Sequence, residues 1–537
     1  MATYRKVRPR WADAPASERG AQTAPPAMAA VIDVGATSIR LAVAEIGSEG
    51  AVRVIEEASR GVLLGKDTFT NGRIGPGVLD MAVRVLEGYA RILEGYGVQR
   101  RRAVATSAIR EATNRDSVLD RIRLRTGIDV EIIDGSEENR LTWLAVRSVL
   151  RGHKALEAKA ALLVALGGGS ADLTLLRSGE PVQSGTYPLG AIRMRQSLSS
   201  WHGTPESRIR LLRRHIHNVA LDVAREIPMG EATQFIALGG DIRFAAERIL
   251  GEAAVAEDAI PSIPRDAFLA LCDEISGDDT ERLAEEHRLA PSEAETLVPA
   301  LIAYREILSA TGAATIVVPQ VSLRSGLLLD LAHRGESAGL EDLRRQVLAG
   351  AETLGEKYRW DALHGRHVAR LSVQLFDALK DEHGMGVRER LLLEVASLLH
   401  DVGMFVSLRG HHKHTQYLLS AAEIFGLSRE DMAVVANVAR YHRRSMPLKS
   451  HPGYIALDRE ARVVVNKLAA ILRLVNALDS DHLQKITDLR LLREEDPWVL
   501  EVTGSGDLTM ERIAALARSD LITEVFGRRI AFRQAAP

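Results

Sequence analysis

Cysteine is almost absent from the 537-residue chain: Cys272 is the only one, so an intrachain disulfide cannot form. A chain without disulfides suits a reducing compartment, and we expect a cytoplasmic location. Aromatic residues make up 4% of the sequence, which argues against stacking on nucleic-acid bases. No apolar run reaches the roughly 18 residues that a membrane span requires, so we expect no membrane partner.

An excess of either charge is also missing. The 69 Lys and Arg residues nearly balance the 71 Asp and Glu residues, which leaves a formal net charge of −2. Proteins that bind nucleic acid usually carry a basic surface, and we therefore expect no nucleic-acid partner. Histidine is the unusual residue, because most of the 16 histidines follow residue 360.

Two distant segments share one layout. In Ala161–Leu176, an apolar strand, a run of three glycines and an alternating strand follow one another. Val31–Ala44 repeats this layout around Gly35. Two such hairpins predict two structurally related halves.

The tips of these hairpins expose backbone N–H groups, and a nest of such amides suits a phosphate. A phosphate bound by both tips would lie in the cleft between the two halves. Glycine-rich turns are also common in ordinary β-hairpins, so the repeat alone leaves a purely structural interpretation open. Asp33, at the mouth of the first turn, either holds a divalent cation or a water or stabilises the turn.

Three further segments place polar groups beside the predicted cleft. Arg110 follows a short strand and is either an anion partner or a surface residue. Glu137 and Glu138 begin a helix, where they either stabilise its positive end or include a general base; the pattern alone favours the first. Gly240 begins another helix, whose N-terminal amides would add a phosphate contact.

Seven motifs in a fixed order resemble the exopolyphosphatase and guanosine pentaphosphate phosphatase (Ppx/GppA) family. They are VIDVGATSIRLAV, ATSAIREATN, IIDGSEENRLTW, LLVALGGGSADL, YPLGAIRM, FIALGGDI and VSLRSGLLLDL. The resemblance implies an α/β fold in residues 28–331, the duplicated ribonuclease-H-like fold of actin and the sugar kinases. It also implies Mg²⁺-dependent removal of terminal phosphate from inorganic polyphosphate or guanosine pentaphosphate (pppGpp).

The resemblance implies roles for the residues that match. Glu138 resembles the residue that activates the attacking water, which reverses the preference from pattern alone, and Arg110 resembles the phosphate-binding arginine. The remaining matches form the implied phosphate and metal cradle: Asp33, Gly35, Thr37, Gly168, Gly169 and Ser170.

One position departs from the family pattern. The family's second loop reads Asp-Ile-Gly-Gly-Gly-Ser-Thr-Glu, and here Ala165 replaces the first aspartate, which is thought to help hold Mg²⁺. A methyl group cannot bind a cation that requires oxygen ligands. Either Asp33, Glu138 and waters suffice, or this half binds phosphate and hydrolyses it slowly or not at all.

The C-terminal part is helical by its apolar spacing and carries a second candidate site. His400 and Asp401 follow an apolar helix, and such a buried pair is costly unless a metal or another partner satisfies it. The set also resembles the HD phosphohydrolase superfamily, with a divalent metal such as Mn²⁺, Fe²⁺ or Co²⁺. The predicted ligands are His364, His400, Asp401, Asp479, His442 and His414, with His411 or His412 as substitutes for His414.

The predicted organisation is a disordered tail (1–28), two actin-like domains (29–160 and 161–335), an all-α HD-type domain (345–485) and a small α+β appendage (486–537). The first predicted function is an exopolyphosphatase-type hydrolase of polyphosphate or guanosine penta/tetraphosphate, acting as a homodimer. One alternative places catalysis at the HD-type metal site, with the N-terminal half as a phosphate sensor. The other is a regulator that binds polyphosphate or alarmone without turnover.

Overall fold

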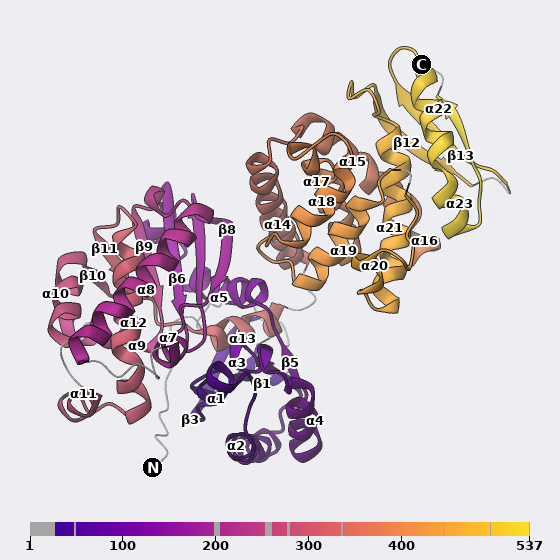
Figure 1. Cartoon of the computed structure of the whole chain (residues 1–537). Coiled ribbons are helices and arrows are strands. Elements are labelled where there is room, and N and C mark those ends of the chain that lie inside the picture. Colours follow the sequence, from indigo (N-terminus) through magenta and orange to yellow (C-terminus); the bar gives the residue numbers. More distant parts are fainter. Residues whose placement is uncertain are drawn as a thin grey trace, which may run out of the picture. The chain divides into compact units, whose positions relative to one another are not determined.

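The computed structural model describes residues 27–47, 50–197, 204–252, 260–276, 280–333, 337–443, 445–493 and 496–535. The chain divides into two compact units, Met1–Leu340 and Glu341–Pro537, shown in Figure 1. The predicted N-terminal tail lies outside the described residues except for Ala27 and Met28, which already belong to the first strand.

The first sheet of unit 1 has the strand order β3-β2-β1-β4-β5. β1, β2 and β3 pair antiparallel, whereas β4 and β5 run parallel to β1. Six of the eight residues of β1 are buried, because apolar residues occupy both faces of this central strand. The strands are β1 Ala27–Val34, β2 Ser38–Ile46, β3 Val52–Gly61, β4 Arg100–Ala105 and β5 Val130–Ile132.

The second sheet repeats this topology. Its order is β10-β11-β9-β6-β7-β8, with β6, β7 and β8 antiparallel and β9 and β11 parallel to β6. Only the edge strand β10 has no counterpart in the first sheet, so the predicted duplication is present. The strands are β6 Ala160–Leu166, β7 Ala171–Arg177, β8 Glu180–Tyr187, β9 Gln234–Leu238, β10 Ser262–Pro264 and β11 Thr315–Val317.

Helices cover both sheets of unit 1 (Figure 1). The glycine-rich segment 61–77 contains helix α1, which buried Leu64 and Thr68 anchor. The helices are α1 Leu64–Asn71, α2 Pro76–Gly95, α3 Ser107–Arg110, α4 Arg115–Thr126, α5 Gly135–Leu150, α6 Lys154–Glu157, α7 Ala191–Ser197, α8 Pro205–Glu226, α9 Gly240–Leu250, α10 Arg265–Ile275, α11 Thr280–His287, α12 Pro291–Ser309 and α13 Leu323–His333.

Helix α13 returns to the first sheet, although it follows the second sheet in sequence. It packs against α5 and β1, and Asp330 on α13 pairs with Arg102 at 3.1 Å and with Arg140 at 2.7 Å. The first lobe therefore comprises residues 27–150 together with α13, and the second lobe comprises residues 160–317. This division differs from the predicted domain boundary at residue 335.

Unit 2 begins with a bundle of helices and ends with a three-stranded sheet. The sheet order is β12-β13-β14, with β12 antiparallel and β14 parallel to β13. The predicted α+β appendage is thus present, with β12 as an additional strand. The elements are α14 Ser337–Lys357, α15 Ala362–Ala378, α16 Lys380–His383, α17 Val387–Leu399, α18 His411–Ser420, α19 Arg429–Arg440, α20 Pro452–Ile455, α21 Arg459–Ala477, β12 Ile486–Leu492, β13 Trp498–Gly504, α22 Thr509–Arg518, α23 Asp520–Phe526 and β14 Ile530–Gln534.

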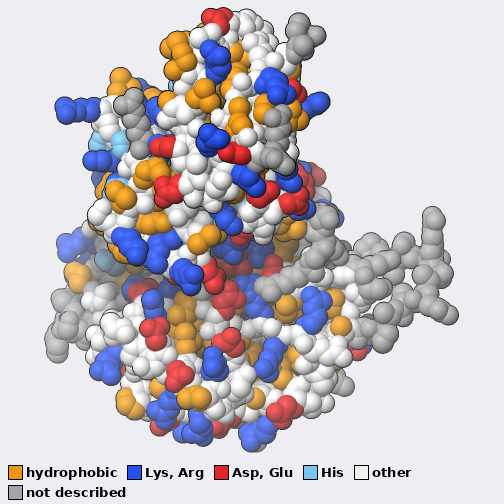
Figure 2. Space-filling view, turned by 90° about the vertical axis from the view of Figure 1, so that its right-hand side faces the viewer, with side chains coloured by type: hydrophobic (Ala, Val, Ile, Leu, Met, Phe, Trp, Pro, Cys, Tyr) orange, Lys and Arg blue, Asp and Glu red, His pale blue; other side chains and the backbone are white. Residues whose placement is uncertain are grey.

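The surface matches the balanced composition. On the face in Figure 2, basic and acidic side chains lie interspersed. In the part of the chain that the structure describes, no helix combines the length and the apolar character that a membrane crossing demands.

Candidate functional site

The two hairpin tips meet inside unit 1. A methyl group added at Gly168 would lie 3.0 Å from Thr37 Cγ2 and 3.1 Å from Ala36 Cβ. The second tip therefore lies in van der Waals range of the first. Gly35 shapes the first turn, because its N–H donates to the Ser38 carbonyl at 3.0 Å.

Neighbouring segments bind the backbone carbonyls of both tips. In the first tip, the Ala36 carbonyl accepts from Gly65 N–H at 2.9 Å and the Thr37 carbonyl accepts from Val62 N–H at 3.0 Å. In the second tip, the carbonyls of Gly167 and Gly168 accept from the first N–H groups of α7, at 3.0 and 2.9 Å.

The N–H groups of the same tips are left for a ligand. Among the described residues, no hydrogen-bond partner exists for the backbone N–H groups of Ala36, Thr37, Gly168, Gly169 and Ser170. Unpaired amides around a concave turn attract an anion. Both tips thus present unpaired amides at Thr37, Gly168, Gly169 and Ser170, and their phosphate-binding role stays a prediction.

Arg193 of α7 fixes the second tip against the first lobe. Its Nε donates to the Gly169 carbonyl at 2.7 Å, and its Nη2 donates to Glu111 at 2.5 Å. The guanidinium also lies 4.1 Å from the centre of the Phe69 ring. Gly190 permits this close approach, because a methyl group there would lie 2.1 Å from the carbonyl carbon of Gly169.

Glu137 and Glu138, adjacent on α5, have different surroundings. Glu137 accepts from Arg102 at 3.0 Å and from Arg140 at 2.7 Å, so it belongs to the ion-pair network that holds α13. Glu138 faces the cleft, where its Oε2 lies 3.4 Å from Arg110 Nη1. The pair thus contains one structural carboxylate and one that is available for chemistry.

Acidic neighbours surround Glu138. Burial, together with the nearby Asp172 carboxylate, raises the pKa of Glu138 to about 8, although Arg110 opposes this. Asp33 adds a smaller repulsion, and burial raises its own pKa as well. Arg110 is held in place, because its Nη1 donates to the Ile133 carbonyl at 2.7 Å.

Asp172 lies directly across the strand pair from Ala165, the position where the family carries aspartate. Its Oδ1 accepts from Thr186 Oγ1 at 2.7 Å. The cleft therefore contains three carboxylates, those of Asp33, Glu138 and Asp172. Among the described residues, the three do not form a close triad of ligand atoms within 4.8 Å.

Several arginines lie near Asp33. Arg40 Nη1 lies 4.0 Å from Asp33 Oδ2, and Arg324 pairs with Glu57 at 3.2 Å. Burial lowers the pKa of Arg243, and the positive charges of Arg40 and Arg324 lower it further. The cleft thus combines carboxylates with a concentration of positive charge.

Gly240 begins α9, as predicted. A methyl group added there would meet no atom within 4 Å, so the helix N-terminus borders open space. Burial raises the pKa of the next residue, Asp241, to about 6.

A second cluster lies in unit 2, where four histidines point one ring nitrogen toward a shared centre. Their other nitrogen, Nδ1, is already bound. For His400, His411 and His442, Nδ1 lies 2.7, 3.1 and 2.5 Å from a backbone carbonyl, and for His364 it lies 2.8 Å from Asp479. This second partner is typical of histidines that bind metal.

The Nε2 atoms of the four histidines converge. Those of His364 and His400 lie 3.2 Å apart, and those of His411 and His442 lie 3.1 Å apart. Asp401 Oδ1 lies 3.1 Å from His411 and 3.4 Å from His442. Burial alone would raise the pKa of Asp401, but His400 and then the other histidines lower it below its usual range.

Two triads within this cluster have ligand atoms close enough to bind an ion: His364, Asp401 and His482, and Asp401, His411 and His442. Asp401 belongs to both and would bridge two ions. Soft-to-intermediate nitrogen ligands with one carboxylate suit Mn²⁺, Fe²⁺, Co²⁺ or Zn²⁺ better than Mg²⁺. The residues present therefore fit a divalent transition metal.

Three of the predicted ligands, His400, His414 and Asp479, belong to neither triad. His411, one helical turn before His414 on α18 and predicted as its substitute, belongs to one of them. Asp479 lies behind His364 and also accepts from Gln484 N–H at 2.7 Å, so it orients that histidine. Sequence reasoning missed His482 as a ligand, although it stands beside Asp479.

Asn476 was also missed. Its Oδ1 lies 3.1 Å from His364 Nε2 and 3.0 Å from His400 Nε2. The sequence signal was available, since Asn476 precedes Asp479 by one helical turn at the end of α21.

A sequence profile of the Ppx/GppA phosphatase family matches residues 42–335, more than half of the chain. The chain belongs to the Ppx/GppA phosphatase family. A second profile, for domain III of Ppx/GppA phosphatases, matches residues 348–525, so unit 2 is assigned to this family and the HD-type assignment stays a prediction.

Relatives of this Ppx/GppA chain carry two names. A guanosine-5'-triphosphate,3'-diphosphate pyrophosphatase of Vibrio parahaemolyticus is 23% identical over 485 residues, covering 88% of this chain and 91% of the relative. Exopolyphosphatase 1 of Mycobacterium leprae is 32% identical over 164 residues, or 30% and 47% of the two chains. The chain is therefore a hydrolase that acts on phosphoric anhydrides.

Solved structures support the fold of unit 1. The exopolyphosphatase crystal structure from Cytophaga hutchinsonii superposes with a TM-score of 0.52 at 23% identity, covering 57% of this chain and 98% of that one. This likeness agrees with the duplicated actin-like topology of the two sheets.

Proposed function

We propose that the chain releases terminal orthophosphate from inorganic polyphosphate or pppGpp, in the cleft between the two hairpin tips, with Mg²⁺. One observation carries the proposal: Glu138, a carboxylate with a raised pKa, borders two tips whose amides are unpaired. A general base with a pKa near the working pH transfers protons efficiently.

Each group of residues in the cleft has its own role in phosphoryl transfer. The tip amides hold the oxygens of the terminal phosphoryl group, and Arg110 offsets the charge that these oxygens carry. Glu138 accepts a proton from the attacking water and orients that water toward phosphorus. Because Glu137 is occupied by Arg102 and Arg140, it is unavailable for this role.

The carboxylates fit Mg²⁺ in the manner that is usual for phosphate enzymes. Mg²⁺ binds through one or two carboxylates, with waters and substrate phosphates as its other ligands. Asp33 and Asp172 provide such carboxylates near Glu138. Asp172 stands where the family's loop carries glutamate, so this half keeps that carboxylate although Ala165 lacks one. When bound, the ion offsets negative charge on the phosphates.

The test is orthophosphate release from long-chain polyphosphate and from pppGpp in Mg²⁺. Glu138→Gln should reduce turnover by about 10²–10⁴-fold, because the amide cannot accept a proton. Glu137→Gln is the matched control, and it should keep turnover if it folds. Equal release by wild type and Glu138→Gln would refute catalysis in this cleft. The ratio of the two wild-type rates assigns the preferred substrate.

The convergence of four Nε2 atoms on Asp401 favours a second candidate function. In this alternative, unit 2 is a metal-dependent phosphohydrolase and unit 1 senses phosphate. A bound metal would lower the pKa of a water and so supply the nucleophile. The histidines and Asp401 would hold the ion, while Asp479 orients His364.

Metal content separates the two candidates. Purified chain reconstituted with Mn²⁺, Fe²⁺ or Co²⁺ should retain metal, and Asp401→Ala should lose most of it; His414→Ala is the matched control and should retain it. Turnover that survives Glu138→Gln but disappears in Asp401→Ala would assign catalysis to unit 2. Unchanged metal content in Asp401→Ala would refute the metal centre.

Two further predictions remain proposals, the homodimer and the cytoplasmic location. A homodimer is tested by light scattering of the purified chain. A cytoplasmic location is consistent with Cys272, which is buried and unpaired. A regulator without turnover does not fit a chain that belongs to a family of hydrolases.

A further inference from the structure

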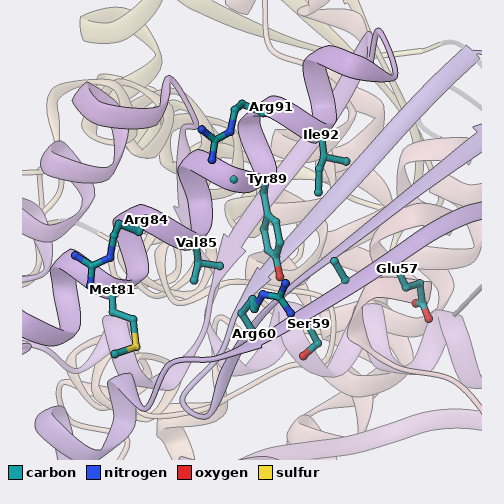
Figure 3. A pocket seen from close by; sticks show the side chains of 11 residues that line it. Glu57, Ser59, Arg60, Met81, Arg84, Val85, Tyr89, Arg91 and Ile92 are labelled. Carbon is teal, nitrogen blue, oxygen red and sulfur yellow. The ribbon is translucent and has the colours of Figure 1, made fainter. Parts of the chain in front are cut away.

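A groove of about 510 Å³ lies on the first lobe, between helix α2 and the edge strand β3. Neither the tips nor Glu138 line it, and its lining residue Glu57 pairs with Arg324 of the cleft at 3.2 Å. Figure 3 shows Tyr89 in its middle, Arg60 beneath the hydroxyl end of Tyr89, and Arg84 and Arg91 projecting from α2 to the left of that ring. Its size suits a small organic ligand, because ligand pockets usually span roughly 300–1,000 Å³.

Two small residues create the groove. Ala58 lines it from β3, and Gly88 lines it from the interior of α2. Glycine destabilises a helix interior relative to alanine, so the presence of Gly88 inside α2 calls for a structural explanation. Packing provides none, because a methyl group added at Gly88 would meet no atom within 4 Å. Its effect is to keep the groove open.

The rim of the groove carries three arginines, and the acidic lining residue Glu57 pairs with Arg324 rather than with them. Among the described residues, Arg60, Arg84 and Arg91 form no ion pair or hydrogen bond through their side chains, and all three are exposed. Most other arginines on this lobe are paired; Arg121, for example, binds Asp80, and Arg125 binds Glu87 at 2.7 Å. An anion with more than one negative charge would provide the counter-charge for the guanidinium groups of these three arginines.

The wall between these arginines is apolar. Met81 is 45% exposed, and Val85 and Ile92 are half-buried beside it. The core side of α2 is formed by other residues, among them Leu79, Ala82, Val83 and Leu86. Met81 and Val85 thus offer an apolar surface to a ligand.

We propose that this groove binds a purine nucleotide that carries two or more phosphates. The arginines contact the phosphates, and the base lies on the wall of Met81, Val85 and Ile92. Bare polyphosphate fits less well, because it would leave that wall in water. The Tyr89 hydroxyl already donates to the Ile39 carbonyl at 2.9 Å, and Glu57 pairs with Arg324 at 3.2 Å, so few polar groups of the groove remain to distinguish guanine from adenine.

The experiment uses the full chain with Glu138→Gln, which should reduce turnover in the cleft by about 10²–10⁴-fold, and saturating tripolyphosphate to occupy the cleft. Calorimetric titration with guanosine 5′-(β,γ-imido)triphosphate and with its adenine counterpart then measures the affinity of the groove for each nucleotide. In this background we compare Arg84→Ala/Arg91→Ala, Gly88→Leu, and the control Arg73→Ala/Arg123→Ala, which removes two exposed arginines of the same lobe outside the groove. Leucine favours helix, so Gly88→Leu fills the groove without breaking α2.

Both nucleotides should bind, with affinities within about threefold of each other, since the wall is apolar. Each groove variant should weaken binding at least about tenfold, and the control should change it less than about twofold. Unchanged affinity in both groove variants would overturn the proposal. So would abolition of nucleotide binding by tripolyphosphate, because the nucleotides would then bind in the cleft, or the groove would take bare polyphosphate. This experiment measures binding and not turnover, so its outcome does not depend on catalysis in the cleft. Failure of the proposed function would appear instead as equal orthophosphate release by wild type and Glu138→Gln.

Discussion

Glu137 and Glu138 are adjacent on α5, yet neutralising them should affect stability in opposite directions. Burial and Asp172 raise the pKa of Glu138 to about 8 from an ordinary value near 4.5. The folded state therefore holds this proton more tightly than the unfolded state does. Its contribution to stability is complete below about pH 4.5 and is lost as the pH rises through about 8.

The magnitude follows from the size of this change. One pKa unit corresponds to 1.36 kcal/mol, so ionising Glu138 removes up to about 5 kcal/mol from the free energy of unfolding. Relaxation of the cleft and entry of water reduce this value, and we expect about 2–4 kcal/mol. Glutamine does not titrate. The free energy of unfolding of Glu138→Gln should therefore exceed that of wild type by this amount at pH 8.5 and nearly equal it at pH 5.

Glu137 provides the opposite case. Burial alone would raise its pKa, but Arg140 and Arg102 outweigh burial and lower it. Ionised Glu137 therefore stabilises the folded state at any pH above the pKa that this residue has in the unfolded chain. This stabilisation is lost only as the pH falls below the range of the experiment. Glu137→Gln should lower the free energy of unfolding by about 1–3 kcal/mol at both pH 5 and pH 8.5, because it leaves two arginines without a partner.

The assay is urea unfolding in EDTA at the two pH values, followed by hydrogen exchange of peptides from β1 and β6. These peptides report unit 1 alone, which matters because a chain of two units does not unfold in one step. A difference between Glu138→Gln and wild type that is the same at both pH values would refute the electrostatic reasoning. Stabilisation by Glu137→Gln would refute the structural role of that residue.

Three more substitutions probe the cleft through steady-state orthophosphate release. Arg193→Lys loses the directed bond to the Gly169 carbonyl, so KM should rise about tenfold while kcat changes less; an equal fall in kcat would contradict a positioning role. Ala165→Asp adds an oxygen ligand opposite Asp172 and should raise turnover at limiting Mg²⁺; an unchanged rate would mean that position 165 is not a ligand. Gly190→Ala pushes a methyl group onto the second tip and should lower kcat/KM about a hundredfold, with circular dichroism unchanged; wild-type activity would mean that the tip geometry is not required.

Much of unit 1 was predictable because its signals are local or repeated. Two hairpins of the same pattern predict two related halves, and the two sheets have the same strand order. The position of α13 was not predictable in this way. Its apolar residues would suit either lobe, and only the distant partners Arg102 and Arg140 of Asp330 decide between them.

The candidate sites show the same limit. Pattern alone could not separate Glu137 from Glu138, because the difference depends on Arg102 and Arg140 from other elements. In unit 2, composition predicts a histidine site, but the choice of His411 over His414 depends on the rotation of α18 about its axis. Sequence spacing does not determine that rotation.

The return of α13 to the first lobe affects the order in which unit 1 can fold during synthesis. Domains generally fold as the ribosome releases them, N-terminal parts first. Here the first lobe to emerge lacks the helix that covers part of its sheet, and buried residues of α13 such as Leu327 and Leu328 arrive only after the whole second lobe. The second lobe is therefore free to fold before the first is complete, and a nascent chain that stalls before residue 323 would expose an apolar face of the first sheet to chaperones.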